Sequence, residues 1–276
     1  MKKLRIALIA MVIALAAVGV AACTGEKKPA SEHTVTFQIA GGGSVESQTV
    51  KDGETAVKPA DPERIGWTFN GWYLGDAEYK FTEKVTEDIT LTARFTSVLG
   101  GDGTAASPFT IDTAEELELM SEYISLGASE FVSANYIQTA NIVSALGEKN
   151  NHASISEFAG IYDGNGMSLS ISDTLFDTLS GTVKNLKLCG EIEVVSSDAE
   201  LSGIPAGVLA NTADGALISG LTVSGNIKSE RAVTGGIVGE LKSGRMEYVN
   251  SSVNVKGLIA GGIAGKSGGS VINCVS

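Results

Sequence analysis

Histidine, cysteine and proline are scarce in this chain, which has two histidines, three cysteines and five prolines among its 276 residues. The histidines, His33 and His152, are far apart and neither lies in a His-Glu-x-x-His run, so the sequence predicts no zinc-peptidase site. Apart from Cys23, the cysteines are Cys189 and Cys274, which make neither a disulfide framework nor a zinc site. We interpret both as small buried hydrophobic residues.

Cations are also in deficit, because 20 Lys and Arg residues face 32 Asp and Glu residues and leave a formal net charge of −12. An acidic surface repels phosphate backbones, so we expect no nucleic-acid partner. Glycine, in contrast, is abundant at 34 residues. Much glycine with little proline favours tight turns between ordered strands over a disordered linker.

The chain begins with the three-part layout of a secretory signal peptide. Lys2, Lys3 and Arg5 precede an uncharged apolar run over residues 6–22, and the sequence turns polar directly after Cys23. The small residues before Cys23 resemble the lipobox of bacterial lipoproteins. The resemblance implies that Cys23 carries a thioether-linked diacylglycerol, becomes the new N-terminus and anchors the protein on the extracytoplasmic face of the membrane. A plain cleaved signal and an uncleaved anchor are the alternatives, although the run has about the minimum length for a span.

Residues 23–33 are polar and lack periodicity, so we expect a short tether there. A first domain is expected over residues 34–96. Its first strand alternates apolar and polar residues around Phe37, and residues 89–95 alternate in the same way, which is typical of half-buried strands.

This first domain contains a series of short motifs. They are Val35-Thr36-Phe37, Gly42-Gly43, Val50-Lys51-Asp52-Gly53, Pro59, Gly66-Trp67-Thr68-Phe69-Asn70-Gly71-Trp72-Tyr73 and Val85-Thr86-Glu87-Asp88-Ile89-Thr90-Leu91-Thr92-Ala93. Together they closely resemble the internalin-type B repeat, also called the Listeria–Bacteroides repeat. The resemblance implies a small β-grasp-like module of bacterial cell surfaces, often present in tandem, whereas this chain has one copy.

The aromatic strand of the first domain has two interpretations. Period-two alternation places Trp67, Phe69 and Tyr73 on one side of it. Trp72 and Tyr73 would suit stacking on a pyranose ring. We favour the other interpretation, in which the aromatic residues fill the core, because a 60-residue domain needs large side chains to bury enough area.

A single helix is expected near residue 113. Thr113 is a suitable N-cap and Glu116 follows three residues later, which is the pattern of a capping box. Apolar residues then recur at helical spacing, at Leu117, Met120 and Ile124. We expect the helix to end near Leu126-Gly127.

Residues 97–276 are expected to form a second domain built from repeats. The segment that starts at Val183 aligns with one that starts at Ile218, 35 residues later, and weaker copies start at Tyr248 and Val271. Such repeated short strands with few intervening helices are typical of a solenoid.

A second track of small residues interleaves with the first, because segments starting at Ala206, Gly235 and Gly261 recur at spacings of 29 and 26. We therefore predict a mostly β fold, in which the β-grasp-like domain is followed by a parallel β-helix with one N-terminal capping helix. Its coils would stack ~4.8 Å apart around inward columns of Ile, Val and Leu. A β-sandwich is the alternative, because short, regularly spaced strands also fit it.

The repeats carry a second resemblance. Its residues are Gly236-Ile237-Val238-Gly239, Gly262-Ile263-Ala264-Gly265 and Val271-Ile272-Asn273-Cys274. They look like the GLUG motif of right-handed β-helices in bacterial surface proteins, including regions upstream of immunoglobulin-A-cleaving metallopeptidases. The resemblance implies right-handed coils, and the peptidase signature itself is absent from this sequence.

Two patterns invite a chemical interpretation. Asp163-Gly164-Asn165-Gly166 has the start of a calcium loop but lacks its later acidic positions, so we predict a tight turn instead. Asp173, Asp177, Asp198 and Glu200 would be the acids of a polysaccharide lyase or glycosidase, yet no basic residue accompanies them at a fixed spacing. We therefore expect no enzymatic activity, no metal and no cofactor.

These features favour a non-enzymatic surface lipoprotein that displays both modules for adhesion to a host or envelope protein or to a glycan. The alternative is the non-catalytic N-terminal region of a larger secreted hydrolase. The sequence stops at Ser276 within a repeat strand and has no polar capping segment. An open solenoid end exposes strand edges, so we expect that the natural chain is longer, was cut short or meets a partner there.

Overall fold

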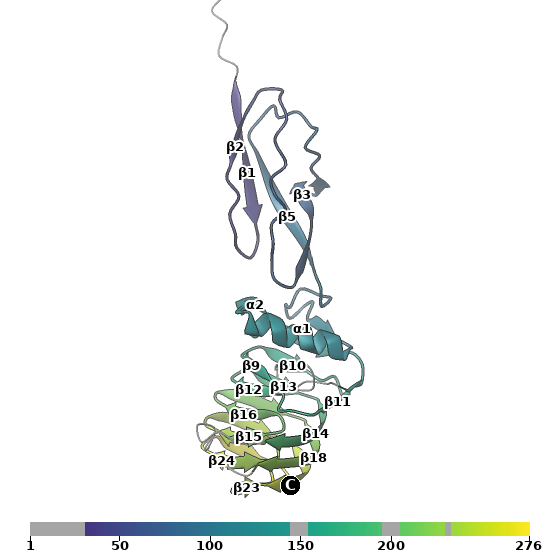
Figure 1. Ribbon diagram of the computed structural model, residues 1–276, viewed down its shortest axis with the longest axis vertical. Coiled ribbons are helices and arrows are strands. Elements are labelled where there is room, and N and C mark those ends of the chain that lie inside the picture. The colour runs from purple at the N-terminus through teal and green to yellow at the C-terminus, as the bar shows by residue number, and fades with distance from the viewer. Residues whose placement is uncertain (1–30, 144–153, 195–204, 230–232) are drawn as a thin grey trace, which may run out of the picture.

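The structure is a computed structural model that describes residues 31–143, 154–194, 205–229 and 233–276. These residues form a rod, with a small sheet domain at one end and a stack of β-coils at the other (Figure 1). Each part has its own hydrophobic cluster, one formed by residues between Val35 and Ala93 and the other by residues between Leu99 and Val249.

The first part, which we call the sheet domain, is one mixed five-stranded sheet in the order β2-β1-β5-β3-β4. Strands β1 and β5 run parallel in its centre, and the other neighbours are antiparallel. This arrangement confirms the β-grasp-like prediction. The strands are β1 (Glu32–Ile39), β2 (Gln48–Lys51), β3 (Trp67–Leu74), β4 (Ala77–Glu78) and β5 (Ile89–Ser97).

Alternation along the central strands builds the core of the sheet domain, as the sequence predicted. Val35 and Phe37 of β1 lie directly beside Ile89 and Leu91 of β5. Val35 and Leu91 are fully buried. Burial of each such side chain contributes about 1.5–3 kcal/mol to the free energy of unfolding.

A helix covers the first coil of the second part. Strand β6 (Phe109–Ile111) precedes α1 (Ala114–Ser125), and α2 (Ser129–Val132) follows it. Thr113 Oγ1 accepts from the N–H of Glu116 at 3.2 Å, and the Glu116 carboxylate accepts from the N–H of Thr113 at 3.2 Å, which confirms the capping box. Such a cap contributes about 1 kcal/mol. The C-cap is Leu126, as predicted, and the helix buries Leu117, Met120 and Ile124 against the coils.

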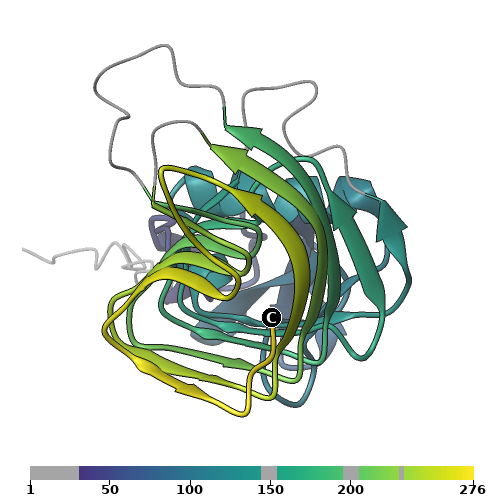
Figure 2. The same ribbon diagram turned by 90° about the horizontal axis from the view of Figure 1, so that it is seen from below.

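The coils stack into parallel sheets, which confirms the β-helix and excludes the sandwich. Seen along its axis, the strands of successive coils lie over one another (Figure 2). One sheet has the order β25-β21-β17-β13-β10-β7-β6 and joins β6 to β7 (Asn135–Gln138), β10 (Ile161–Asp163), β13 (Thr182–Lys184), β17 (Ala216–Ser219), β21 (Gly244–Glu247) and β25 (Ser270–Ile272).

Three further sheets complete the coils. One joins β8 (Ile142–Val143), β11 (Ser168–Ile171), β14 (Lys187–Val194), β18 (Thr222–Ser229) and β22 (Asn250–Lys256). Another joins β9 (Ile155–Phe158), β12 (Phe176–Leu179), β16 (Ala210–Ala213), β20 (Val238–Leu241) and β24 (Ala264–Ser267). The smallest joins β15 (Ala206–Gly207), β19 (Val233–Gly235) and β23 (Ile259–Gly261).

The strand register confirms the main repeat and corrects two others. Val183 pairs with Ile218, which is the predicted spacing of 35. The next coil is in register from Met246, two residues before the predicted start at Tyr248. The second track is spaced by 28 and not 29, because Gly207, not Ala206, pairs with Gly235. Inward apolar side chains set the register of buried strands. The alignment of the sequence by its glycines therefore placed this register one residue away from the observed pairing.

Aromatic side chains fill the first coils, where the sequence predicted aliphatic columns. Phe158 is fully buried, stacks on Phe176 at 5.1 Å and contacts Tyr136 at 5.8 Å between ring centroids. The fully buried Tyr162 donates its hydroxyl to Gln138 Oε1 at 3.0 Å. The Gln138 amide in turn donates to two backbone carbonyls, at 2.7 and 2.9 Å. The polar groups that this core buries here are therefore hydrogen-bonded.

The two parts meet at a compact junction. Arg64 donates two hydrogen bonds to the Glu130 carboxylate, at 2.9 and 3.3 Å, and its guanidinium lies 4.0 Å from the Trp67 ring. The Trp67 indole donates to the same carboxylate at 2.7 Å. Gly66 has a φ of +76°, and a Cβ there would lie 2.4 Å from the Phe131 ring. A planar, bidentate ion pair and close packing thus join the sheet domain to the β-helix.

Candidate functional site

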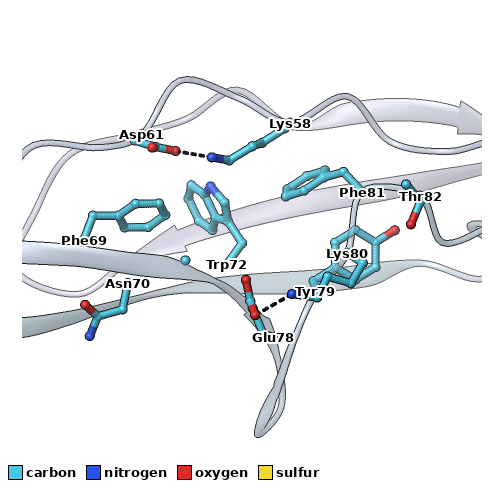
Figure 3. Close-up of a pocket in the computed structure, with 11 residues that line it drawn as sticks. Lys58, Asp61, Phe69, Asn70, Trp72, Glu78, Tyr79, Lys80, Phe81 and Thr82 are labelled. Atoms are coloured by element: carbon cyan, nitrogen blue, oxygen red, sulfur yellow. Dashed lines mark hydrogen bonds and ion pairs between the residues drawn. The ribbon is translucent and has the colours of Figure 1, made fainter.

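A groove with a volume of about 530 Å³ opens on the sheet domain. Its lining comes from β3, from the segment that begins with β4, and from the loop that carries Lys58 and Asp61. The lining residues are Lys58, Asp61, Phe69, Asn70, Gly71, Trp72, Glu78, Tyr79, Lys80, Phe81 and Thr82. Figure 3 shows the aromatic rings following one another between two ion pairs.

A β-bulge in β3 decides which aromatic residue faces the groove. The register between β3 and β5 shifts between Phe69 and Gly71, and Gly71 has a φ of 132°, which favours glycine. Trp72 therefore lies on the same side of the sheet as Phe69, with ring centroids 5.8 Å apart. Bulges re-aim side chains in this way.

The bulge corrects one prediction and confirms another. Tyr73 was expected beside Phe69, but its ring lies under the Arg94 guanidinium at 4.3 Å and does not line the groove. Trp72 is 1 % exposed, so it fills the core as we favoured and offers no open face for stacking on a sugar.

Two polar groups at the groove lack hydrogen-bond partners among the described residues. They are the indole Nε1 of Trp72 and the hydroxyl of Tyr79, and neither is open to solvent. Burial, followed by the nearby Glu83 carboxylate, raises the pKa of Tyr79, so its hydroxyl keeps its proton at neutral pH. A buried donor without a partner costs more than its hydrogen bond would contribute, so this pair needs an explanation.

The charges at the groove cancel in pairs. Lys58 lies 2.7 Å from Asp61, and Lys80 lies 2.5 Å from Glu78. All four side chains are half or more exposed, so each pair contributes at most about 1 kcal/mol and opens readily. The rim of the groove is thus neutral and weakly held.

The predicted alternatives for catalysis lie on the β-helix. Burial above all, and then the nearby Asp177, raises the pKa of Asp173. Asp177 accepts hydrogen bonds from Ser154 at 2.6 Å and from the Asn211 amide at 2.9 Å. Asp198 and Glu200 lie outside the described residues.

The Asp163 segment is a turn, as predicted. Asn165 has a φ of 51°, and its N–H donates to the Asp163 carboxylate at 2.9 Å. Asn185 and Lys184 of the next coil bind the same carboxylate, at 3.1 Å each. Burial would raise the pKa of Asp163, but these hydrogen bonds and the lysine lower it. Among the described residues, no group of three His, Cys, Asp or Glu side chains is placed to hold a metal ion.

The cysteines have different outcomes. Cys23 and His152 lie outside the described residues, so the structure does not place the predicted lipidation site. Cys189 and Cys274 are free thiols, and both are half-buried where we expected full burial. Cys189 lies on β14, and Cys274 follows the end of β25.

The groove itself could not be predicted from the sequence. Trp72 was singled out but neither Tyr79 nor Phe81 was, because a two-residue strand such as β4 leaves no periodic pattern. The absence of hydrogen-bond partners depends on tertiary packing, which a single sequence does not record.

Comparison with known proteins finds a family match within the sheet domain. Residues 33–94 match the family model of the Listeria-Bacteroides repeat domain, which confirms that resemblance for this part of the chain. A provisionally named membrane protein of Evansella cellulosilytica is 36% identical over 69 residues, which are 24% of this chain and 10% of the relative. A provisionally named Gly-rich membrane protein of the same organism is 35% identical over 69 residues, or 24% of this chain and 8% of the relative.

The match thus spans a tenth or less of the length of these relatives. Within the described residues, no helix is both long enough and apolar enough to cross a bilayer.

Proposed function

We propose that this protein is a non-enzymatic adhesin of the bacterial cell envelope. In this proposal, lipid on Cys23 anchors the chain, and the rod carries the Listeria–Bacteroides repeat domain and the β-helix away from the membrane. The names of the two relatives and the family match at residues 33–94 support an envelope location.

The observation that carries the proposal is the direction of the rod. Strand β1 begins at the end of the sheet domain that is remote from the β-helix (Figure 1). An anchor that precedes β1 therefore leaves the β-helix pointing outward. The bidentate Arg64–Glu130 pair and the packing at Gly66 stiffen the joint between the two parts.

The lateral faces of the β-helix suit display. The strands β14, β18 and β22 lie in register and carry an exposed polar ladder, in which Asn226 donates to Glu191 at 2.8 and 3.1 Å and Asn254 donates to Asn226 at 2.9 Å. Such ladders present evenly spaced hydrogen-bonding groups along the rod. We further infer that the coils are of the GLUG type, because Gly236-Ile237-Val238-Gly239 and Gly262-Ile263-Ala264-Gly265 lead into the stacked strands β20 and β24.

The anchor is tested by labelling cells that express the full chain with an alkyne fatty acid. We expect label on the wild type and on Cys189→Ala, but none on Cys23→Ala, which should leave the membrane fraction. Two or more acyl chains hold a protein stably, whereas one holds it marginally. An unlabelled wild type with an intact N-terminus in mass spectra would contradict lipidation.

Adhesion is tested separately. Cells that display the wild type should bind immobilised host or envelope material more than cells that express Cys23→Ala at the same level. Equal binding by both strains would contradict the adhesin proposal, whatever the labelling shows.

A further inference from the structure

We propose that the groove of the sheet domain binds a short stretch of an uncharged glycan. This inference deepens the proposed adhesin function, because it names a ligand class and the residues that recognise it. It treats Trp72 as a hydrogen-bond donor and not as a stacking platform.

A pair of unpartnered polar groups faces this part of the sheet domain. Trp72 Nε1 donates only, and the Tyr79 hydroxyl both donates and accepts. Both side chains are more than nine-tenths buried, line the groove and have no partner among the described residues. Sugar hydroxyls both donate and accept, so hydroxyls along a short stretch of glycan suit both groups.

A weakly held ion pair gives a ligand a way to the indole of Trp72. Figure 3 shows the indole nitrogen of Trp72 on the side of its ring that faces Lys58 and Asp61. That ion pair is more than half exposed on both sides, so little holds it closed. Opening it uncovers the indole N–H, and the sugar then takes the place of the exposed pair.

Aromatic rings give the groove an apolar wall. Phe69 and Phe81 line the groove and are only partly buried, so part of each ring stays accessible. The face of an aromatic ring carries partial negative charge, which attracts the C–H groups on the flat side of an all-equatorial pyranose. An apolar wall with a few placed polar groups is typical of small-ligand sites, and the volume of about 530 Å³ lies within their range.

The charges and the short edge strand at the groove disfavour ions and extended peptides as ligands. Two lysines and two acids are already paired at the rim, so no net charge attracts an ion. An extended peptide would add to a sheet edge, but β4 at this edge spans only two residues. An uncharged and compact ligand with hydroxyl groups fits both limits.

The test is a titration of the 15N-labelled full chain in detergent with cellotetraose, and with tetragalacturonic acid as the charged comparison. The chain has two tryptophans, so two indole N–H signals report separately. We expect cellotetraose to move the Trp72 signal downfield, as a new hydrogen bond does. The Trp67 signal, which is already bonded to Glu130, should stay in place. The acidic sugar should act at least tenfold more weakly.

The matched variants are Tyr79→Phe and Tyr73→Phe. Loss of the Tyr79 hydroxyl should weaken binding about five- to tenfold without unfolding the domain, since that hydroxyl has no partner to lose. Tyr73→Phe, outside the groove, should bind within twofold of the wild type.

No shift of the Trp72 signal at millimolar sugar overturns the proposal, as does equal binding by Tyr79→Phe. Perturbation of the groove by a protein and not by the sugar also overturns it. These results leave the adhesion assay on whole cells unaffected, so failure here is distinct from failure of the adhesin proposal.

Discussion

The sheet domain and the first coils of the β-helix treat a buried tyrosine hydroxyl in opposite ways. Tyr162 of the β-helix is fully buried and donates to Gln138. Tyr79 of the sheet domain is nearly as buried and has no partner among the described residues. The first coils thus satisfy their buried tyrosine internally, although Ser251 Oγ in the last coils also lacks a partner among the described residues. Of these unpartnered groups, those of Trp72 and Tyr79 line the groove, so we place sugar recognition on the sheet domain.

The largest expected effect is loss of a core ring from the β-helix. Phe158→Ala should cost about 3–5 kcal/mol of unfolding free energy, because it removes a stacked, fully buried side chain. Circular dichroism during denaturation should show the loss. Fluorescence of Trp72, measured in a Trp67→Phe background, should show a smaller change.

Ile161→Ala is the control for that experiment, since Ile161 lies on a neighbouring strand and is 39% exposed. It should change stability by less than about 1 kcal/mol. Equal losses in the two variants would mean that the aromatic stack does not hold the first coils together.

The next effect compares the two tyrosines. Tyr162→Phe leaves the Gln138 carbonyl oxygen without its donor and should destabilise the protein by about 1–3 kcal/mol. Tyr79→Phe removes an unpaired hydroxyl, so the unfolding free energy should stay equal or rise. Urea denaturation of both variants measures the difference, and destabilisation of similar size in both would break the comparison.

A smaller effect is expected at the junction. Arg64→Ala removes a bidentate, half-buried ion pair and should cost about 1–2 kcal/mol. The fluorescence and circular dichroism transitions should then move apart, because the two regions unfold more independently. Asp76→Asn, at the exposed Arg94–Asp76 pair, should leave both transitions in place.

The smallest effect is a pH dependence within the β-helix. Burial, aided by Asp177, raises the pKa of Asp173, so the folded state binds that proton more tightly than the unfolded state. The ionised carboxylate therefore weakens the fold at neutral pH, and Asp173→Asn should stabilise it there. The gain should fade as the pH falls through the raised pKa of the folded state and should be gone below about 4, the pKa of an unfolded aspartate.

Asp163→Asn is the matched opposite. Hydrogen bonds and Lys184 outweigh burial and lower the pKa of Asp163, so its ionised form stabilises the fold above the unfolded pKa. That variant should lose stability at neutral pH and approach the wild type as acid protonates the carboxylate. Parallel pH profiles for the two variants would contradict these assignments.

The sequence predicted features that repeat or that rest on local chemistry. The 35-residue register from Val183, the Thr113 capping box and the alternation around Phe37 all follow from periodicity or spacing. Its errors came where packing overrides a pattern. The bulge at Gly71 places Trp72, and not the expected Tyr73, on the side of the sheet that faces the groove. Inward side chains pair Gly235 with Gly207, one residue away from the expected partner.

Only part of the candidate site could be predicted from the sequence. Trp72 was singled out for its aromatic ring, but its free N–H is a property of what packs around it. Tyr79 follows a two-residue strand and gave no pattern at all. Unsatisfied groups are where local rules fail, and such failures are expected at functional sites.

The most direct test is to denature the full chain with and without cellotetraose and to follow both regions at once. A ligand that binds only the folded groove raises the stability of that region, by about 1.4 kcal/mol at ten times the dissociation constant. We predict that the Trp72 transition shifts to higher denaturant while the β-helix transition does not. A shift of the β-helix transition alone, or of neither transition, would contradict the assignment of the sugar site to the sheet domain.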